Sequence, residues 1–336
     1  MDGCRFIYFT NLNMIAFLNL IRYKNLIIVA LTQYLMRHAI ISTILTVNDF
    51  ELQLDEFHFF LLVLATALIT AAGYVINDYF DTRTDLLNRP DAVVIGKQIS
   101  RRYAIILHWI FSFTGIIIGF YIAFHVDVPF LGLSFVIVSG LLWIYSTKYN
   151  RQFLIGNLII AFLTAMVPFM VLLFEIPMLN KEYGAILKIN QTSFNYIFAW
   201  VGSFSYFAFL TTLIRELIKD IEDYDGDKAE SRRSVPIVIG ISNTKLIIGG
   251  LIFMTLLSLA YIFKAYLLIG FYGETDYISL VYFLVCLLIP FSLLFYKVIK
   301  ARSKADFRYA HILAKIIMLI GLMYSLLVRY IILSSF

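Results

Sequence analysis

Long apolar runs separated by short polar stretches dominate the pattern of this chain. Several runs reach the ~20 residues that an α-helix needs to cross the hydrocarbon core of a bilayer. The predicted fold class is therefore all-α: one domain over residues 1–336, built as a bundle of nine transmembrane helices. The expected spans are residues 25–46, 57–77, 103–124, 129–147, 153–174, 193–217, 244–267, 277–297 and 309–333.

Composition supports a membrane protein. Of the 336 residues, 61% are hydrophobic and 15% are charged, with a mean hydropathy of +0.85. A soluble domain has about half apolar and about a quarter charged residues, so a soluble helical protein with a large core is disfavoured. Cys4 and Cys286 are far apart and Cys286 lies inside an apolar run, which predicts neither a disulfide framework nor a cysteine metal site.

Lys and Arg residues gather in alternate loops of this arrangement. The other loops hold only Lys181, Lys188 and Lys264. The positive-inside rule then predicts a multi-pass protein of the cell (inner) membrane with its N-terminus in the cytoplasm and its C-terminus outside. Residues 1–23 are expected to be a cytoplasmic or interfacial segment, with a short helix at Met14–Arg22. The basic residues form no single stripe, so nucleic acid is not expected as a partner, and no obligate protein partner is expected.

A polar stretch at the end of the second span is the first candidate site. Asn77, Asp81 and Asp85 are spaced by four residues, so on a helix they lie along one face. Together with Asp78 they bring three carboxylates close together, and these repel one another unless a cation joins them. Clustered oxygen ligands suit Mg²⁺, which takes one or two carboxylates and completes its shell with water and phosphate oxygens.

A second acidic stretch follows the sixth span. On a helix, Glu216, Asp220, Asp223 and Asp227 fall within roughly 60° of one another. The loop charges put both stretches on the cytoplasmic side, where they can face each other across a cavity. The alternative is that both are solvated helix ends neutralised by Lys and Arg. Two matching stretches on one membrane face make that alternative less favourable, because clustered acids at a membrane helix end are costly.

Facing carboxylate stripes can hold Mg²⁺ ions that grip a diphosphate, which leaves readily once its charge is neutralised. A pocket among membrane helices suits a hydrocarbon tail, and aromatic rings can stabilise a developing carbocation. The aromatic candidates beside the motifs are Tyr79, Tyr145 and Tyr224. The nearby cations that can take the remaining phosphate charge are Arg83, Arg89, Lys97, Lys148 and Lys219.

At these residues the chain resembles the UbiA superfamily of intramembrane aromatic and lipid prenyltransferases. The first motif reads Asn77-Asp78-x-x-Asp81-x-x-x-Asp85, followed by Arg89-Pro90. The second reads Asp220-x-x-Asp223-x-x-x-Asp227, followed by Ser234-Val235-Pro236. The resemblance implies a cytoplasm-facing active-site cavity and Mg²⁺-dependent transfer of a prenyl group from a prenyl diphosphate to a lipophilic acceptor within the lipid bilayer.

The resemblance also implies roles for individual residues. Metal binding is implied for Asn77, Asp81, Asp85, Asp220, Asp223 and Asp227, and a catalytic role for Asp81, Asp85, Asp220 and Asp223. Substrate contacts are implied for Arg22, Asn25, Asp78, Arg89, Lys97, Tyr145, Lys148, Arg151 and Lys219. The chain departs from the family where Arg22-Tyr23-Lys24-Asn25 replaces Arg-Pro-x-Asn, and where Tyr145 is followed by both Lys148 and Arg151.

The stretch from Arg215 to Asp227 is most similar to the branch of digeranylgeranylglyceryl phosphate synthases. That branch alkylates the free hydroxyl of an isoprenyl glycerol phosphate, which implies geranylgeranyl diphosphate as the donor and ether-lipid synthesis as the role. An aromatic quinone precursor is the alternative acceptor. A cation-coupled transporter is the alternative of another class, but its carboxylates would be expected near the membrane midplane rather than at helix ends.

Several other residues are expected to be structural. Arg37 lies inside the first span, near enough to its outer end to snorkel to the interface. Pro168 and Pro290 are expected to kink their helices. No metal-like spacing links the histidines His58, His108, His125 and His311.

Overall fold

The computed structural model describes residues 14–267 and 276–334. Within these ranges the elements are helices, and the nearest approach to a sheet is an isolated bridge between Ile95 and Ile99. Nine helical segments in the described ranges are long and apolar enough to cross a membrane. They are Tyr23–Val47, Glu56–Asn88, Arg101–His125, Pro129–Thr147, Ile155–Ile189, Asn195–Glu222, Ile241–Ala265, Tyr277–Lys300 and Lys304–Ser334. The predicted all-α bundle of nine spans is confirmed.

Six spans are built mainly on one long α-helix each. These are α4 (Glu56–Asn88), α5 (Arg101–His125), α6 (Gly132–Thr147), α7 (Ile155–Ile189), α8 (Asn195–Glu222) and α14 (Lys304–Ser334). Three spans contain a π-helical stretch. They are α2 (Tyr23–Leu35) with Met36–Ile41 and α3 (Ser42–Val47), α11 (Ile241–Ile262) with Phe263–Leu267, and α12 (Tyr277–Tyr282) with Phe283–Leu288 and α13 (Ile289–Lys300). The short helices α9 (Tyr224–Ala229) and α10 (Val235–Ile239) follow α8.

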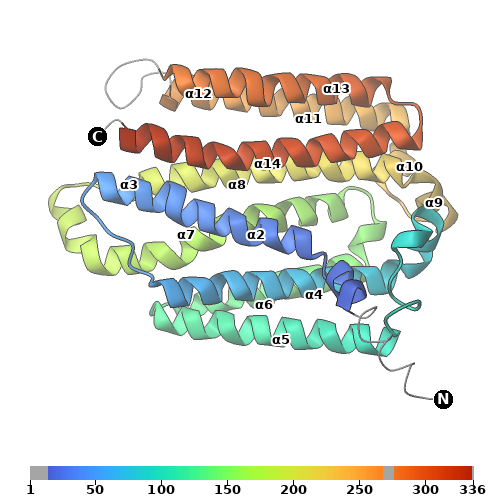
Figure 1. The fold of residues 1–336 in the computed structure, drawn as a ribbon, viewed down its shortest axis with the longest axis horizontal. Helices are drawn as coiled ribbons and strands as arrows, with labels where there is room; N and C mark the ends of the chain where they lie inside the picture. The colour runs from blue at the N-terminus through green and yellow to red at the C-terminus, as the bar shows by residue number, and fades with distance from the viewer. Residues whose placement is uncertain (1–13, 268–275, 335–336) are drawn as a thin grey trace.

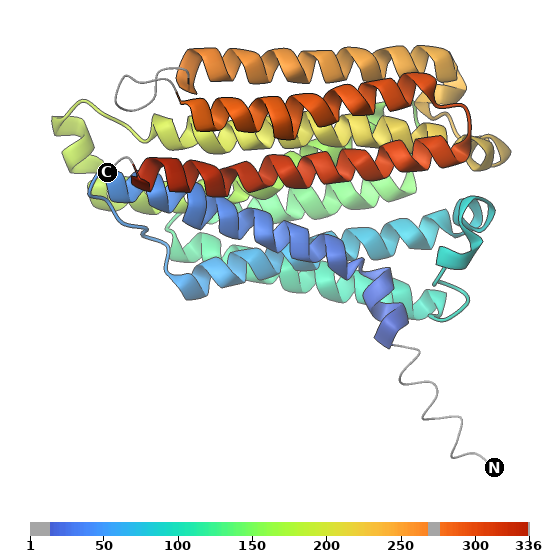
Figure 2. The ribbon, with the colours of Figure 1, turned by 45° about the horizontal axis from the view of Figure 1, so that its top comes forward.

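The spans run side by side along the long axis of the molecule (Figures 1 and 2). α4 packs against α5 and α6, α7 against α8, and α8 against α14 and α11. The end of the bundle where α4 and α8 finish is called the motif end here, and the opposite end is the far end. The helix over residues 14–20 lies at the motif end, and α14 finishes at the far end (Figure 1).

Two helices are longer than the sequence predicts. α4 was expected to stop at residue 77, but it continues through the acidic motif to Asn88, because nothing breaks the helix before Pro90. α7 was expected to stop at residue 174, but it continues to Ile189 with Pro168 and Pro177 inside it. Pro290 follows directly on the π-helical stretch Phe283–Leu288, which agrees with its missing N–H interrupting the regular hydrogen-bond ladder.

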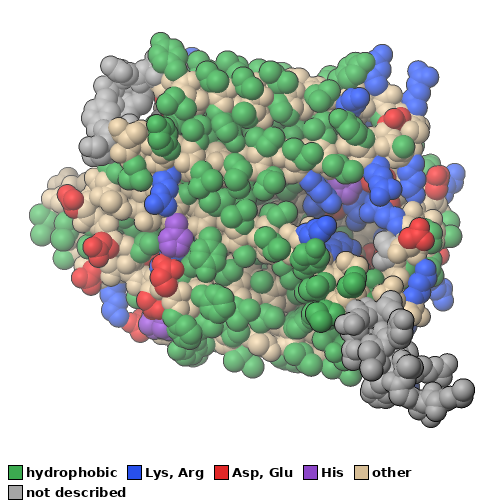
Figure 3. Space-filling view, in the orientation of Figure 1, with side chains coloured by type: hydrophobic (Ala, Val, Ile, Leu, Met, Phe, Trp, Pro, Cys, Tyr) green, Lys and Arg blue, Asp and Glu red, His purple; other side chains and the backbone are tan. Residues whose placement is uncertain are grey.

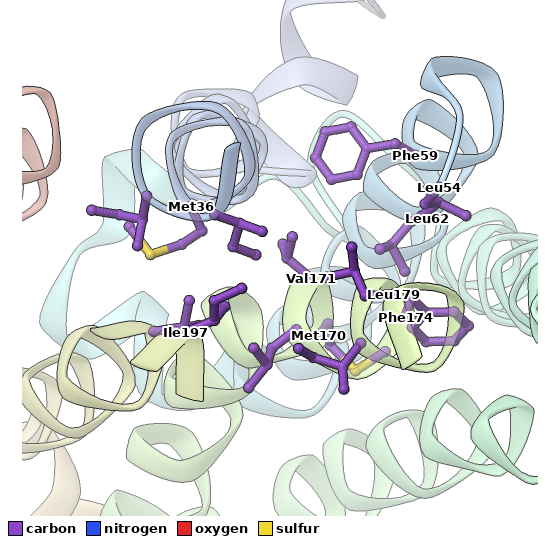
Figure 4. Close-up of a cluster of buried hydrophobic side chains, with 14 of the residues drawn as sticks. Met36, Leu54, Phe59, Leu62, Met170, Val171, Phe174, Leu179 and Ile197 are labelled. Carbon is purple, nitrogen blue, oxygen red and sulfur yellow. The ribbon is translucent and has the colours of Figure 1, made fainter. Parts of the chain in front are cut away.

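The helices are held together by close packing. In a bilayer, lipid tails are as apolar as Leu, so helix association depends on van der Waals contact. Figure 4 shows buried side chains of the first span, α4, α7 and α8 meeting in one cluster, among them Met36, Phe59, Phe174 and Ile197. α5 and α6 approach closely at Gly119, where a Cβ atom would lie 2.2 Å from the ring of Phe135.

The position of Arg37 differs from the expectation that its side chain reaches the membrane interface. Arg37 is 1% exposed and does not snorkel to the interface. Its guanidinium donates to the carbonyl oxygen of Leu54 and lies 3.6 Å from Glu175 and 3.4 Å from Glu56. Glu175 is fully buried and accepts hydrogen bonds from the backbone N–H groups of Gln53 (2.7 Å) and Leu54 (3.1 Å). This cluster ties the loop between α3 and α4 to α7 at the far end.

Replacing Glu175 with Gln should destabilise the fold by about 3–5 kcal/mol, because it leaves the buried Arg37 without its buried counter-charge. The matched change Glu56→Gln removes a carboxylate that is 66% exposed, so its effect should be small. Thermal unfolding of both variants in the same detergent measures the difference. Equal losses in the two variants would contradict a buried Arg37–Glu175 pair.

Candidate functional site

The first acidic motif lies on the last turns of α4. Asp78 accepts a hydrogen bond from Arg22, with 2.7 Å between the Arg22 Nη2 and Asp78 Oδ1 atoms. Asp81 is 8% exposed and accepts from Asn150 at 2.9 Å. The carboxylate of Asp85 makes no ion pair or side-chain hydrogen bond within the described part of the chain. The oxygen of Asn77 is buried and also lacks a hydrogen-bond partner there.

The second motif spans the end of α8 and the short helix α9. Asp220 accepts from Asn157 at 2.9 Å, and Asp223 lies 3.2 Å from Arg89. The chain then turns so that Asp227 is buried at 6% exposure. α9 packs directly on the end of α4, because a Cβ atom at Gly226 would lie 2.4 Å from the side chain of Asn88. A glycine at this position therefore brings the second motif against the first.

Arg232 joins the two motifs. Its guanidinium donates to Asp81 and to the hydroxyl of Thr84 (2.8 Å), and its Nε lies 3.7 Å from Asp227. Burial raises the pKa of Asp227 to about 6, with Arg232 acting in the opposite direction. Burial acts to lower the pKa of Arg232, but Asp81 and Asp227 outweigh it and raise that pKa, so Arg232 stays charged.

Two more arginines pair with acids at this end. Arg89 contacts both Glu222 (2.9 Å) and Asp223 (3.2 Å) and so ties the end of α4 to the end of α8. Arg22 sits between the helix of residues 14–20 and α2 in a left-handed backbone conformation, with φ of 51°. Its guanidinium lies 4.9 Å from the ring centre of Tyr74, and the attraction of Asp78 raises its pKa above the ordinary value.

A cavity of about 1660 Å³ opens beside the motifs. Asn77 and Lys219 line it at the motif end, and Tyr324 and Ile332 line it near the far end. Most of its wall is apolar. The Lys and Arg residues that line it lie at the motif end, and Asn195, Asp276 and Ser279 line it at the far end. Figure 3 shows Lys and Arg side chains gathered at that end, around a hollow in the surface.

The cavity separates the predicted substrate-contact residues into two sets. Arg22, Asn25, Tyr145 and Lys219 line it, and Asn25 also donates to the Tyr74 hydroxyl at 3.3 Å. The remaining predicted cations and aromatic residues do not line it. Lys97 donates to the carbonyl of Pro90, Lys148 and Arg151 are exposed, Tyr79 lies under Arg101, and Tyr224 lies near Lys228.

The donor atoms of the two motifs fit a hard divalent cation. All six predicted ligands offer carboxylate or amide oxygen, the ligand type that Mg²⁺ prefers. Among the described residues, the carboxylate of Asp85 makes no ion pair or side-chain hydrogen bond, and that of Asp220 is bonded only by the neutral amide of Asn157. The oxygen of Asn77 has no hydrogen-bond partner there either. Each motif therefore keeps oxygen atoms that could coordinate a cation.

Sequence reasoning missed several partners of the motifs. Asn150 and Asn157 lie far from their partners Asp81 and Asp220 in the chain, and Arg232 follows the second motif closely but binds Asp81 of the first. His311 donates to Glu222 at 3.0 Å across the α8–α14 packing. Only the cation-rich stretch around Arg232 gave a signal in the sequence. Spacing could not predict contacts between elements whose packing was unknown.

At the far end the structure brings three side chains together. The spacing of the histidines in the sequence did not indicate this cluster. The ligand atoms of Asp55, His58 and His125 lie within 4.8 Å of one another, and the two imidazoles stack. Among the described residues, no three of the motif carboxylates come that close. This separation agrees with one or two carboxylates for each Mg²⁺ ion.

Comparison with known proteins identifies relatives of this arrangement. The family model for the UbiA prenyltransferase family matches residues 43–332. The digeranylgeranylglyceryl phosphate synthase of Methanothermobacter thermautotrophicus is 31% identical over 203 residues, which is 60% of this chain and 63% of that protein. The enzyme of the same name from Thermococcus sibiricus is 33% identical over 195 residues, 57% of this chain and 60% of that protein. The matches thus span less than two thirds of these relatives.

Solved structures share the fold over nearly the full length. A structure described as digeranylgeranylglyceryl phosphate synthase aligns with a TM-score of 0.58 at 24% identity, covering 94% of this chain and 98% of the other. A UbiA homologue from Archaeoglobus fulgidus bound to DMAPP and Mg²⁺ aligns with a TM-score of 0.53 at 15% identity, covering 92% of this chain and 98% of the other. With the paired motifs, the nine spans and the family match in agreement, the chain belongs to the UbiA prenyltransferase family.

Proposed function

We propose that this protein transfers a geranylgeranyl group from geranylgeranyl diphosphate to the free hydroxyl of an isoprenyl glycerol phosphate, forming an ether lipid. The observation that carries the proposal is the long apolar cavity whose charged end meets two carboxylate motifs. Measured along α14, the cavity wall from Lys315 to Ile332 covers about 26 Å at 1.5 Å per residue, long enough for an extended isoprenoid chain. The names of the relatives support this choice of substrates.

The motif residues would hold the donor diphosphate through Mg²⁺. The first motif would contribute Asn77, Asp81 and Asp85, and the second Asp220, Asp223 and Asp227. Bound there, Mg²⁺ would neutralise the diphosphate so that it can leave. Arg89 supports this arrangement by holding the ends of α4 and α8 together, which fixes the distance between the motifs.

The cavity would control what happens once the diphosphate begins to leave. Its apolar wall excludes water, which would otherwise capture the developing cation at the first carbon of the prenyl group. Tyr145 lines the cavity close enough to Glu216, Asp81 and Asp220 to interact with their charges. Its ring would then lie between the motifs and the prenyl tail. An aromatic face at this position can stabilise the cation until the acceptor hydroxyl attacks.

The distribution of charge supports an orientation in the cell membrane. Lys and Arg gather at the motif end (Figure 3), which the positive-inside rule assigns to the cytoplasm. The N-terminus would then be cytoplasmic and the C-terminus outside. A water-soluble diphosphate donor head group would reach the motifs from the cytoplasm, and both lipophilic substrates would enter from the bilayer.

Replacing Asp81 or Asp220 with Asn should lower turnover by orders of magnitude, because each change removes one anionic ligand while nearly keeping its shape. The matched control is Asp225→Asn, which changes an exposed acid in the same stretch as the second motif. The assay uses purified protein with labelled geranylgeranyl diphosphate, an isoprenyl glycerol phosphate and limiting Mg²⁺. Near wild-type turnover of either motif variant would contradict the assignment.

Replacing Arg232 with Gln tests whether Mg²⁺ binds between the motifs without relying on turnover. Without Arg232, Asp81 and Asp227 lose their shared counter-charge, so the protein should be less stable in EDTA and should gain more from added Mg²⁺ than the wild type does. Melting temperatures with EDTA and with Mg²⁺ measure both effects. The exposed neighbour Arg233 provides the control Arg233→Gln, and an identical Mg²⁺ response of all three proteins would count against the site.

The orientation can be tested with single cysteines in a protein whose Cys4 and Cys286 are replaced by Ser. Cysteines at the exposed positions Arg83 and Lys228, both at the motif end, should react with a membrane-impermeant maleimide only in permeabilised cells. A cysteine at exposed Lys188, at the far end, should react in intact cells. The reverse pattern would overturn the proposed orientation.

A further inference from the structure

Four cations line the motif end of the cavity. Arg22 comes from the turn before α2, Arg215 and Lys219 lie one turn apart on α8, and Lys315 comes from α14. Lys315 is close enough to the other three for their positive charges to repel one another. Three separate parts of the chain therefore direct positive charge at one region of the cavity wall.

Two of these four cations make no ion pair among the described residues. Arg22 pairs with Asp78, and Arg215 pairs with Glu216. Lys219 and Lys315 make no ion pair and no side-chain hydrogen bond to any described residue. The Nε of Arg215 is also buried without a hydrogen-bond partner. Glu216 and Asp223 also attract Lys219, but cations outnumber acids on this part of the cavity wall, and the region keeps unused N–H donors.

The position of Lys315 is unusual for a lysine. It lies eleven residues into α14, beyond Lys304 and Arg308, and no further charged residue follows on α14 until Arg329. It is one helical turn deeper than His311, which contacts Glu222 at the end of α8. A cation inside a membrane-spanning helix is costly and normally serves a ligand or pairs with a partner. Lys315 has no such partner among the described residues, and it faces the cavity.

The four cations line the cavity itself, whereas the motif aspartates lie beside it. None of Asp81, Asp85, Asp220, Asp223 and Asp227 lines the cavity beside the four cations. A metal-held diphosphate needs the carboxylates, whereas a phosphomonoester of charge close to −2 is matched by lysine and arginine alone. The site therefore offers two kinds of phosphate recognition: carboxylates that could hold a diphosphate through a metal ion, and Lys and Arg side chains that could bind a phosphomonoester directly.

We propose that Lys315, together with Lys219, Arg215 and Arg22, binds the phosphomonoester of the acceptor directly, without a metal ion. The proposal rests on the proposed function, and it names the residues that would select a phosphorylated acceptor over an uncharged one. Lys148 and Arg151, two of the other cations that the sequence offered as substrate contacts, are exposed and lie outside the cavity. Neither Lys315 nor Arg215 stood out as a substrate contact in the sequence.

The first test compares substrates in steady-state kinetics. Lys315→Gln should raise the KM for the isoprenyl glycerol phosphate about tenfold or more, with the KM for geranylgeranyl diphosphate within about twofold of wild type, because a charge-assisted bond to the acceptor alone is lost. Lys315→Arg should largely restore the acceptor KM. Lys300→Gln, which removes an exposed lysine outside the cavity, is the matched control. A rise in the donor KM as large as in the acceptor KM would overturn the proposal.

The second test measures binding without turnover. In EDTA, the wild type should bind the isoprenyl glycerol phosphate and should bind the dephosphorylated glycerol ether about tenfold more weakly, while Lys315→Gln should bind the two equally. Discrimination by Lys315→Gln that equals the wild type would overturn the proposal. If the wild type turns over no glycerol phosphate acceptor, the proposed function fails, yet this binding comparison still decides whether the four cations recognise a phosphomonoester.

Discussion

Compensation of charge inside an apolar bundle is the constraint on which the rest of this structure depends. Carboxylates taken out of water must find cations or strong donors, or they repel one another. At the motif end, Arg232 meets this need for Asp81 and Asp227, and Arg89 meets it for Glu222 and Asp223. Both arginines connect helices that are distant in the chain. The same ion pairs that neutralise the site therefore also hold its two halves at a fixed distance.

The two ends of the bundle meet this constraint in different ways. At the far end, Arg37 and Glu175 are almost fully buried with their charged groups 3.6 Å apart, and one carboxylate oxygen also accepts from the backbone of residues 53 and 54. This cluster lies away from the cavity and joins parts of the protein to each other. At the motif end, Lys219 and Lys315 line the cavity and make no ion pair among the described residues, and the carboxylate of Asp85 makes none either. The charged groups of the far end thus mainly bind one another, whereas several of those at the motif end remain available to a ligand.

The sequence predicted the parts of this architecture that depend on local pattern. Apolar runs predicted nine spans, and the spacing of four residues predicted that Asn77, Asp81 and Asp85 share one face of a helix, which is α4. It did not predict that α4 continues to Asn88 or α7 to Ile189, because polar residues at a helix end look the same whether the helix stops or continues. The roles of Arg232 and Lys315 could not be predicted, since helix packing, and not sequence spacing, brings Arg232 to Asp81 and Lys315 to Arg215 and Lys219.

Arg22 links the position of the first helix to the electrostatics of the site. It forms the turn between the helix of residues 14–20 and α2, in a left-handed backbone conformation that costs a non-glycine residue roughly 1–2 kcal/mol. Its ion pair with Asp78 fastens this turn to α4. The start of the first span is consequently anchored by an aspartate of the second, so a change at Asp78 would alter both the charge beside the motifs and the attachment of α2.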